Sequence, residues 1–310
     1  MSGRAKIAFI GAGNIGGAAA YLTAIKELGD IVLFDVVEDM PMGKALDLSH
    51  SAAVLNSSVS ITGTNSYADI KDADVCIVTA GLARKPGMSR DDLLATNSKI
   101  MKSVAQGIKE NAPNSFVIIV SNPLDAMVTL AQRETGFPAE KVVGMAGVLD
   151  SGRYGSFLSD ELKVSPANIT AFVLGGHGDD MVPIRSHTSN AGVPIENFVA
   201  SDRLEQIETR VRKAGGEVVS LLKTGSAYFS PAASAVTMAE AYLKDQKKLL
   251  PCAAKLNGEY GYKDLYMGVP VIIGAKGVEK IVEIEMTDSE KAALKVSADK
   301  VDALVKSLPA

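Results

Sequence analysis

The chain has 310 residues, of which 47% are hydrophobic and 22% charged, a composition typical of folded proteins that excludes a disordered scaffold. Its 32 basic and 36 acidic residues give a net charge of −4, with no long run of either sign. A general nucleic-acid binder would carry a clustered basic surface, so we expect no nucleic-acid partner.

The first half of the chain alternates short apolar segments with helical patterns. The predicted strands are Lys6–Ile10, Ile31–Phe34, Ser60–Gly63, Val75–Val78, Phe116–Val120 and Val142–Gly144. The predicted helices cover Ile15–Leu28, Pro41–Leu55, Leu93–Glu110 and Pro123–Glu134. Continuous apolar strands in βα alternation indicate a sheet covered on both faces, so the fold class is α/β. We predict a Rossmann doubly wound parallel sheet over residues 1–145.

The second half has strands with irregular connections and longer helices. The strands are predicted at Ile169–Leu174, Val182–His187, Lys248–Leu256, Val269–Ile273 and Lys280–Glu285. The helices are predicted over Asp202–Lys223, over Pro231–Lys244 and after the capping box Thr287-x-x-Glu290. This order predicts an α+β substrate domain over residues 146–310.

Neither a signal peptide nor a membrane helix is predicted. The N-terminus runs directly into a short strand, and no apolar run approaches the ~18 residues that span a bilayer. Cys76 and Cys252 lie far apart in apolar segments, which gives no support for a zinc or dithiol site. We therefore expect a cytoplasmic protein in a reducing compartment, with no metal and no membrane partner.

The segment Gly11-Ala12-Gly13-Asn14-Ile15-Gly16 is a G-x-G-x-x-G between a predicted strand and a predicted helix. Asp35 ends the next strand, 24 positions after Gly11. Glycines there allow a tight turn and let the backbone approach a pyrophosphate at the helix N-terminus. The Asp35 carboxylate would accept hydrogen bonds from the ribose hydroxyls and would repel a 2′-phosphate, which favours NAD over NADP. The alternative is a turn that only packs a helix on a strand.

Polar residues follow several predicted strands, where open α/β sheets bind their ligands. They lie in the segments Gly81–Asp91 with Arg84, Lys85 and Arg90, Ser121–Pro123, Leu149–Arg153 and Gly175–Asp179. A carboxylate, an arginine, an imidazole and a cationic loop are the parts needed to handle a hydroxy acid.

Each of these residues also has an ordinary structural interpretation. The cationic loop could simply be solvated. Asp150 could cap a helix that begins at the next residue, with Arg153 paired to a surface acid. His50 falls in a predicted helix and His187 in a predicted strand, which suggests packing or interface roles. His177 lies among glycines, where an imidazole can protrude, although an ordinary turn is the alternative.

In chain order, these motifs resemble the lactate/malate dehydrogenase family over nearly the whole chain. The resemblance is carried by Gly11–Gly16 with Asp35, Ala83–Gly87 with Arg90, Val120–Pro123, Leu149–Arg153 and Gly176–Asp179. It implies NAD as cofactor, a small 2-hydroxy acid as substrate, and a homodimer or homotetramer.

The resemblance implies catalytic roles for His177, Asp150 and Arg90. His177 would accept or donate the proton, Asp150 would orient and stabilise its imidazolium, and Arg90 would polarise the carbonyl. Arg153 would bind the substrate carboxylate as a two-pronged fork. Asn122 would contact the substrate and the nicotinamide ribose region.

The resemblance also assigns a cofactor groove. Its residues are Gly11, Ala12, Gly13, Asn14, Ile15, Gly16, Asp35, Asn97, Val120, Ser121 and Asn122.

Arg84 is the position that decides the substrate. Lactate enzymes of the family typically have glutamine there, and arginine resembles the malate type. Burying a second carboxylate without a cation would be costly, so we expect a dicarboxylate substrate, malate or oxaloacetate. Ala227, where lactate enzymes tend to have threonine, agrees with this. The alternatives are a lactate or broad 2-hydroxyacid dehydrogenase and, in another class, a non-catalytic dinucleotide sensor.

Asp180 departs from the family pattern, which more usually has a small hydroxyl residue there. A second acid close to His177 could raise the pKa of the imidazole.

Overall fold

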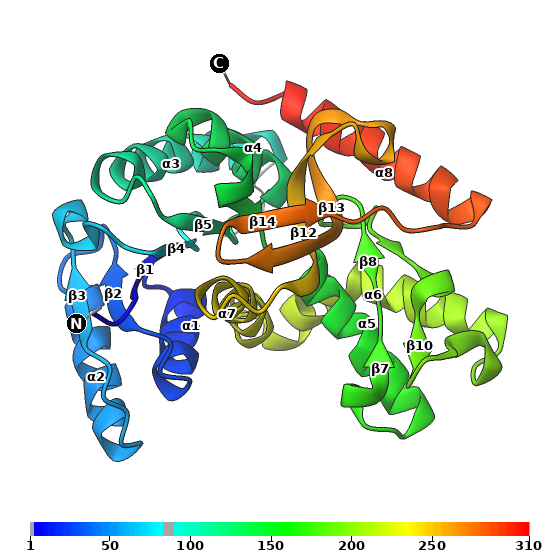
Figure 1. Cartoon of the computed structure of the whole chain (residues 1–310), viewed down its shortest axis with the longest axis horizontal. Helices are drawn as coiled ribbons and strands as arrows, with labels where there is room; N and C mark the ends of the chain where they lie inside the picture. Colours follow the sequence, from blue (N-terminus) through cyan, green and yellow to red (C-terminus); the bar gives the residue numbers. More distant parts are fainter. Residues whose placement is uncertain (1–2, 83–89, 310) are drawn as a thin grey trace.

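The centre of the fold is one mixed sheet (Figure 1). The computed structural model describes residues 3–82 and 90–309, without the side chains of residues 90 and 91. Within these residues, nine strands form the sheet, in the spatial order β14 (Gly277–Ile281), β13 (Lys263–Gly274), β12 (Lys248–Asn257), β6 (Val142–Gly144), β5 (Phe116–Ile119), β4 (Val75–Val78), β1 (Lys6–Ile10), β2 (Asp30–Phe34) and β3 (Ile61–Thr64). The strands from β3 to β6 pair in parallel, which confirms the predicted doubly wound sheet.

Alternate residues of these strands face two separate hydrophobic cores. Ile7 and Phe9 of β1 point into one core, and Ala8 and Ile10 into the other. Because both faces are buried, the strands have the continuous apolar sequences from which they were predicted.

Helices from both halves of the chain cover the two faces. They are α1 (Asn14–Ile25), α2 (Met40–Val54), α3 (Arg90–Asn111), α4 (Leu124–Thr135) and α7 (Phe229–Leu243). In Figure 1, α3 and α4 lie above the sheet and α1 and α7 below it. The buried alanines of α1 and α7 share one core with Ile7 and Phe9, which allows these two helices to pack closely on the sheet.

The sheet continues across residue 145 into the second half of the chain. β12 pairs antiparallel with β6, where Ala253 lies opposite Gly144, and β13 and β14 extend the sheet further. An added Cβ at Gly144 would lie 2.9 Å from the Ala253 methyl carbon, so a small residue is needed at this junction. We propose that residues 1–145 and 146–310 form a cofactor half and a substrate half, although they share this sheet.

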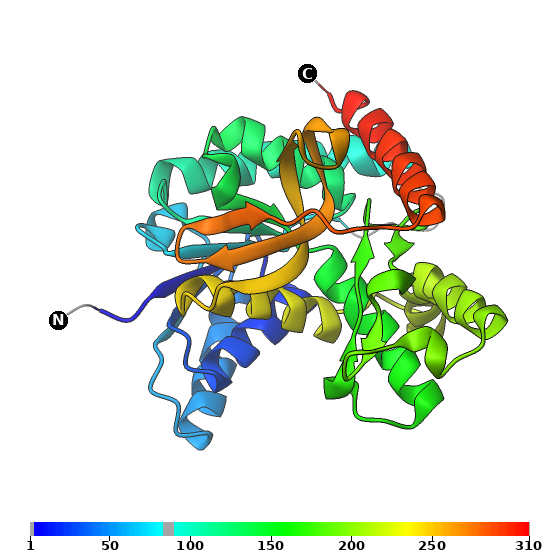
Figure 2. The same cartoon turned by 45° about the vertical axis from the view of Figure 1, so that its right-hand side comes forward.

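The elements from α5 to α6 lie together beside the sheet (Figure 2). They are α5 (Gly147–Leu162), β7 (Ile169–Thr170), β8 (Val173–Leu174), β9 (Val182–Pro183), β10 (Ser189–Asn190), β11 (Val193–Pro194) and α6 (Ser201–Leu222). The last helix, α8 (Asp288–Lys306), buries Leu294, Ala298 and Val301 in the same core as the sheet. Short 3₁₀ helices are found at Tyr67–Ile70, Ala139–Lys141, Pro166–Asn168, Arg185–His187, Ile195–Asn197 and Glu259–Gly261. The capping box predicted at Thr287 and Glu290 is present at the start of α8.

Three local predictions are wrong for identifiable reasons. The strand predicted over 169–174 is divided into β7 and β8, because β7 pairs with β10 and β8 with β9. The strand predicted over 182–187 ends at Pro183, because Arg185–His187 form a 3₁₀ turn instead of continuing the strand. The last strand is Gly277–Ile281 instead of 280–285, because a two-residue turn after Gly274 brings Gly277 opposite it.

Asp150 does not cap a helix that begins at Ser151. α5 already begins at Gly147, which places Asp150 inside its first turn.

Among the helices of the described residues, none is both long enough and apolar enough to cross a membrane.

Candidate active site

The glycine-rich turn between β1 and α1 has the geometry of a dinucleotide cradle. Gly11 has a φ of +111°, and an added Cβ at Gly16 would lie 1.9 Å from the Gly11 carbonyl oxygen, so both positions need glycine. An added Cβ at Gly13 would meet no atom within 4 Å, because this side of the turn is open. No side chain caps α1, which leaves the N–H groups of its first turn to an anion such as pyrophosphate.

Asp35 ties the end of β2 to this turn. Its Oδ2 accepts the N–H of Ala12 at 2.8 Å, and its Oδ1 accepts the N–H of Val37 at 3.1 Å. An ionised carboxylate offers about four acceptor positions, so the same group can also accept ribose hydroxyls. The residues of this turn therefore fit a dinucleotide with an unmodified ribose.

Asn97 and Ser121 hold the loops that follow β4 and β5. The Asn97 amide accepts the N–H of Leu82 at 2.8 Å and donates to the carbonyl of Asn122 at 2.6 Å. The Ser121 hydroxyl donates to the carbonyl of Ala80 at 2.5 Å. Both side chains are buried, and their hydrogen bonds to main-chain atoms fix the shape of the predicted cofactor groove.

His177 contacts Asp150 directly. The His177 Nδ1 lies 2.7 Å from the Asp150 Oδ2, and the Arg153 Nη1 donates to the Asp150 Oδ1 at 3.1 Å. Asp150 and Arg153 lie on one face of α5 at i,i+3 spacing, whereas His177 comes from the loop after β8. A carboxylate at Nδ1 favours the tautomer with hydrogen there, which leaves Nε2 to exchange a proton with a ligand.

The charges around His177 favour its protonated form. Burial disfavours the imidazolium, but the charge and hydrogen bond of Asp150 and the charge of Asp125 outweigh that effect. The pKa of His177 therefore lies above its usual value, although Arg153 acts in the opposite direction. An imidazole whose charged form is stabilised in this way is suited to accept a proton and to return it.

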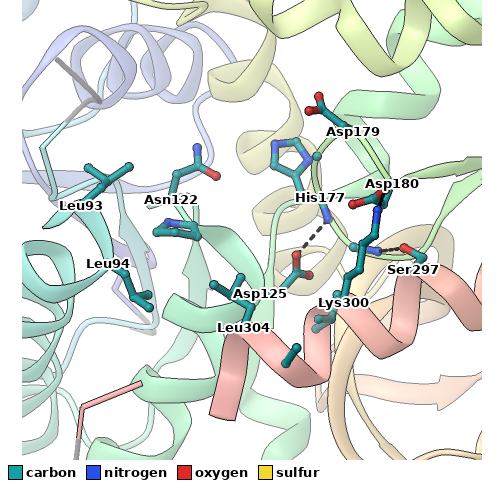
Figure 3. Close-up of a pocket in the computed structure, with 15 residues that line it drawn as sticks. Leu93, Leu94, Asn122, Asp125, His177, Asp179, Asp180, Ser297, Lys300 and Leu304 are labelled. Carbon is teal, nitrogen blue, oxygen red and sulfur yellow. Dashed lines mark hydrogen bonds and ion pairs between the residues drawn. The ribbon is translucent and has the colours of Figure 1, made fainter. Parts of the chain in front are cut away.

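Two cavities lie next to these side chains, one beside His177 and one beside Arg153. The first has a volume of about 500 Å³ and is lined by His177, Asn122, Asp125 and Lys300 (Figure 3). The second, of about 490 Å³, lies between α5, α6 and α7 and is lined by Arg153. Both volumes fall within the usual range for small-molecule sites. Asp150 connects His177, which lines the first cavity, with Arg153, which lines the second, because each of its oxygens contacts one of the two side chains.

Arg84 lies outside the described residues, as does the side chain of Arg90, whose backbone begins α3. Asp180, whose effect on the pKa of His177 the sequence left open, forms an ion pair with Lys300 of α8. The carboxylates that raise the pKa of His177 are Asp150 and Asp125 instead. Among the residues that the structure describes, no cluster of His, Cys, Asp and Glu has the geometry of a metal site.

Asp125 lines the first cavity and was not predicted from the sequence. Its Oδ2 accepts the main-chain N–H of His177 at 2.9 Å. The signal that could have indicated it is a carboxylate in the first turn of α4, three residues after Asn122, at the sheet edge where ligands bind.

The chain is similar to known dehydrogenases over its whole length. A family model described as the NAD binding domain of lactate/malate dehydrogenase matches residues 5–144, and one described as the alpha/beta C-terminal domain matches residues 147–308. A malate dehydrogenase of Caulobacter vibrioides is 55% identical to it, and the match covers 99% of this chain and 98% of that protein.

Two solved structures from Cryptosporidium parvum are also similar to the chain. The malate dehydrogenase has a TM-score of 0.96 at 46% identity, covering 98% of this chain and 99% of the other. The lactate dehydrogenase, solved with lactic acid and nicotinamide adenine dinucleotide, has a TM-score of 0.97 at 47% identity and covers 99% of both chains. The fold therefore does not distinguish lactate from malate enzymes.

Replacing the Asp35 carboxylate should weaken the preference for NAD over NADP. In Asp35→Ser we expect the ratio of kcat/KM for the two cofactors to fall about tenfold or more, because the repulsion of a 2′-phosphate is lost. Asp35→Asn is the matched variant: it also removes the negative charge, but its amide oxygen can still accept the hydrogen bond from the N–H of Ala12. An unchanged ratio in both variants would contradict a ribose role for Asp35.

Proposed function

The chain belongs to the lactate/malate dehydrogenase family, and from this premise we propose that it is an NAD-dependent malate dehydrogenase that interconverts malate and oxaloacetate. The observation that carries the proposal is the 2.7 Å contact between the His177 imidazole and the buried Asp150 carboxylate. The 55% identity to a malate dehydrogenase supports malate as the substrate over lactate.

The glycine-rich turn and the N-terminus of α1 are suited to hold the pyrophosphate of the cofactor, and Asp35 its adenosine ribose. NAD, when bound, supplies the hydride acceptor. The side-chain amide of Asn97 forms hydrogen bonds with the main chain of Leu82 and Asn122. These bonds hold the groove in its shape without a ligand.

The proton is carried by His177. During malate oxidation the Nε2 of His177 accepts the proton of the substrate hydroxyl, and the reverse reaction returns it. Asp150, 1% exposed, stabilises the imidazolium that forms and prevents the ring from turning.

Arg153 binds one carboxylate of the substrate. Its Nη1 is already held by Asp150, so the guanidinium is fixed in direction while its other N–H groups remain for the substrate. We assign the second substrate carboxylate to Arg84, the polarised carbonyl oxygen to Arg90 and a further substrate contact to Asn122. These assignments come from the family pattern.

We also propose that the enzyme is a cytoplasmic homodimer or homotetramer. Large apolar side chains are exposed on α2, α6 and α7, for example Val54 at 81%, Leu221 at 73% and Phe229 at 70%. A second copy that covers them would remove this apolar surface from water. Cys76 and Cys252 are both buried and unpaired, as suits a reducing compartment.

His177→Asn should abolish most of the catalysis and leave cofactor binding intact. We expect kcat to fall at least about 100-fold, the usual scale of an acid–base contribution. NADH binding, followed by fluorescence, should be unchanged, since His177 is not part of the dinucleotide cradle. His187→Asn is the matched control and should retain normal turnover. Near-normal turnover of His177→Asn would mean that another group carries the proton.

Arg84→Gln should reduce turnover of oxaloacetate far more than turnover of pyruvate. The loss of a charge-paired hydrogen bond to the second carboxylate corresponds to about tenfold or more in kcat/KM, and pyruvate has no such group. Lys85→Gln removes a neighbouring positive charge and should affect both substrates equally. Equal losses with both substrates in Arg84→Gln would contradict the role of Arg84.

A further inference from the structure

Two consecutive main-chain N–H groups of the His177 loop are held by side chains from two different helices. The N–H of Gly176 donates to the Ser297 hydroxyl of α8 at 2.9 Å. The N–H of His177 donates to the Asp125 carboxylate of α4, also at 2.9 Å. Figure 3 shows both contacts on the side of the loop that faces α8. The backbone that carries the imidazole is thus anchored by two side chains that line the same cavity as His177.

The two anchors are equally buried but differ in charge. Ser297 is fully buried and Asp125 is 3% exposed. Ser297 is neutral, whereas the Asp125 Oδ1 has no hydrogen-bond partner among the described residues. A buried carboxylate with one unpaired oxygen is costly, and an amide oxygen could accept the same N–H. The hydrogen bond alone therefore does not explain why this position has a carboxylate.

The charge of Asp125 is coupled to that of His177. Burial raises the pKa of the Asp125 carboxyl to about 6, while the N–H and the positive charge of His177 act against that rise. In return, the Asp125 charge raises the pKa of His177, adding to the effect of Asp150. The position in the first turn of α4 also favours a negative charge.

We propose that Asp125 is a positioning residue for the proton transfer, which fixes the main chain of His177 and, with Asp150, stabilises its imidazolium. It is not a catalytic residue, because its contact is with the His177 backbone. This inference rests on the proposed function of His177 as the proton carrier.

Other charged groups near His177 must be considered together with Asp125. Within the described residues they are Asp150 and Arg153 on α5, Asp179 and Asp180 on the loop itself, and Lys300 on α8. Lys300 and Asp180 form an ion pair with each other, so their charges largely cancel at the imidazole.

The direct test is an NMR titration of the histidine Cε1 resonances in the full-length protein. The chain has three histidines, and the His177→Asn variant identifies the resonance of His177. Asp125→Asn keeps an acceptor for the N–H but removes the charge, so the pKa of His177 should fall by about half a pH unit or more. Ser297→Ala removes the neutral anchor beside it and should leave that pKa unchanged. Asp125→Glu keeps the charge, with room in the adjacent cavity, and should preserve the pKa.

The same shift should appear in the kinetics. Reduction of oxaloacetate needs protonated His177, so its rate falls as the pH rises through the pKa of that residue. In Asp125→Asn this fall should occur at lower pH, whereas in Ser297→Ala it should occur at the wild-type pH.

An unchanged pKa of His177 in Asp125→Asn would overturn the inference, as would an equal decrease in Ser297→Ala. If Asp125→Asn does not fold, Asp125→Ser, which also removes the charge, is compared in the same way. Because the titration does not depend on turnover, it is separate from the proposed function. That function fails if wild-type protein binds NADH but does not reduce oxaloacetate, whatever the pKa of His177.

Discussion

The two oxygens of the buried Asp150 carboxylate serve two different side chains. One oxygen lies 2.7 Å from the Nδ1 of His177, and the other accepts a hydrogen bond from the Nη1 of Arg153 at 3.1 Å. A nearly fully buried charge is tolerable only when it is paired, and here each partner is a group that the proposed reaction needs. The proton carrier and the substrate-binding arginine are consequently held in a fixed relation by one acid.

The sheet and its helices serve to bring these groups together. α5 begins directly after β6, so Asp150 and Arg153 lie at the edge of the sheet where the parallel strands end. The loop with His177 is attached to this edge by one residue from each half of the chain, since the N–H of His177 donates to Asp125 and the N–H of Gly176 donates to Ser297. The extension of the sheet through β12, β13 and β14 makes the two halves share one core.

Much of the fold could be predicted from the sequence, because its signals are local. The βα order, the glycine-rich turn and the capping box at Thr287 each depend on neighbouring residues. Predictions were wrong where pairing partners decide the outcome, as in the division of 169–174 between β7 and β8. The anchors of the His177 loop were missed because they are distant in sequence, with Asp125 separated from His177 by 52 residues and Ser297 from Gly176 by 121. The family resemblance supplied the roles of the site residues, whereas the contacts between them come from the structure.

The most direct test of this account is the oxidation of NADH by the wild-type protein, followed by absorbance, with oxaloacetate and pyruvate compared at equal concentrations. The account predicts rapid turnover with a strong preference for oxaloacetate. A preference for pyruvate would contradict the assignment of the substrate while preserving the proton chemistry. Binding of NADH without turnover of either substrate would contradict the proposed function of the contact between His177 and Asp150.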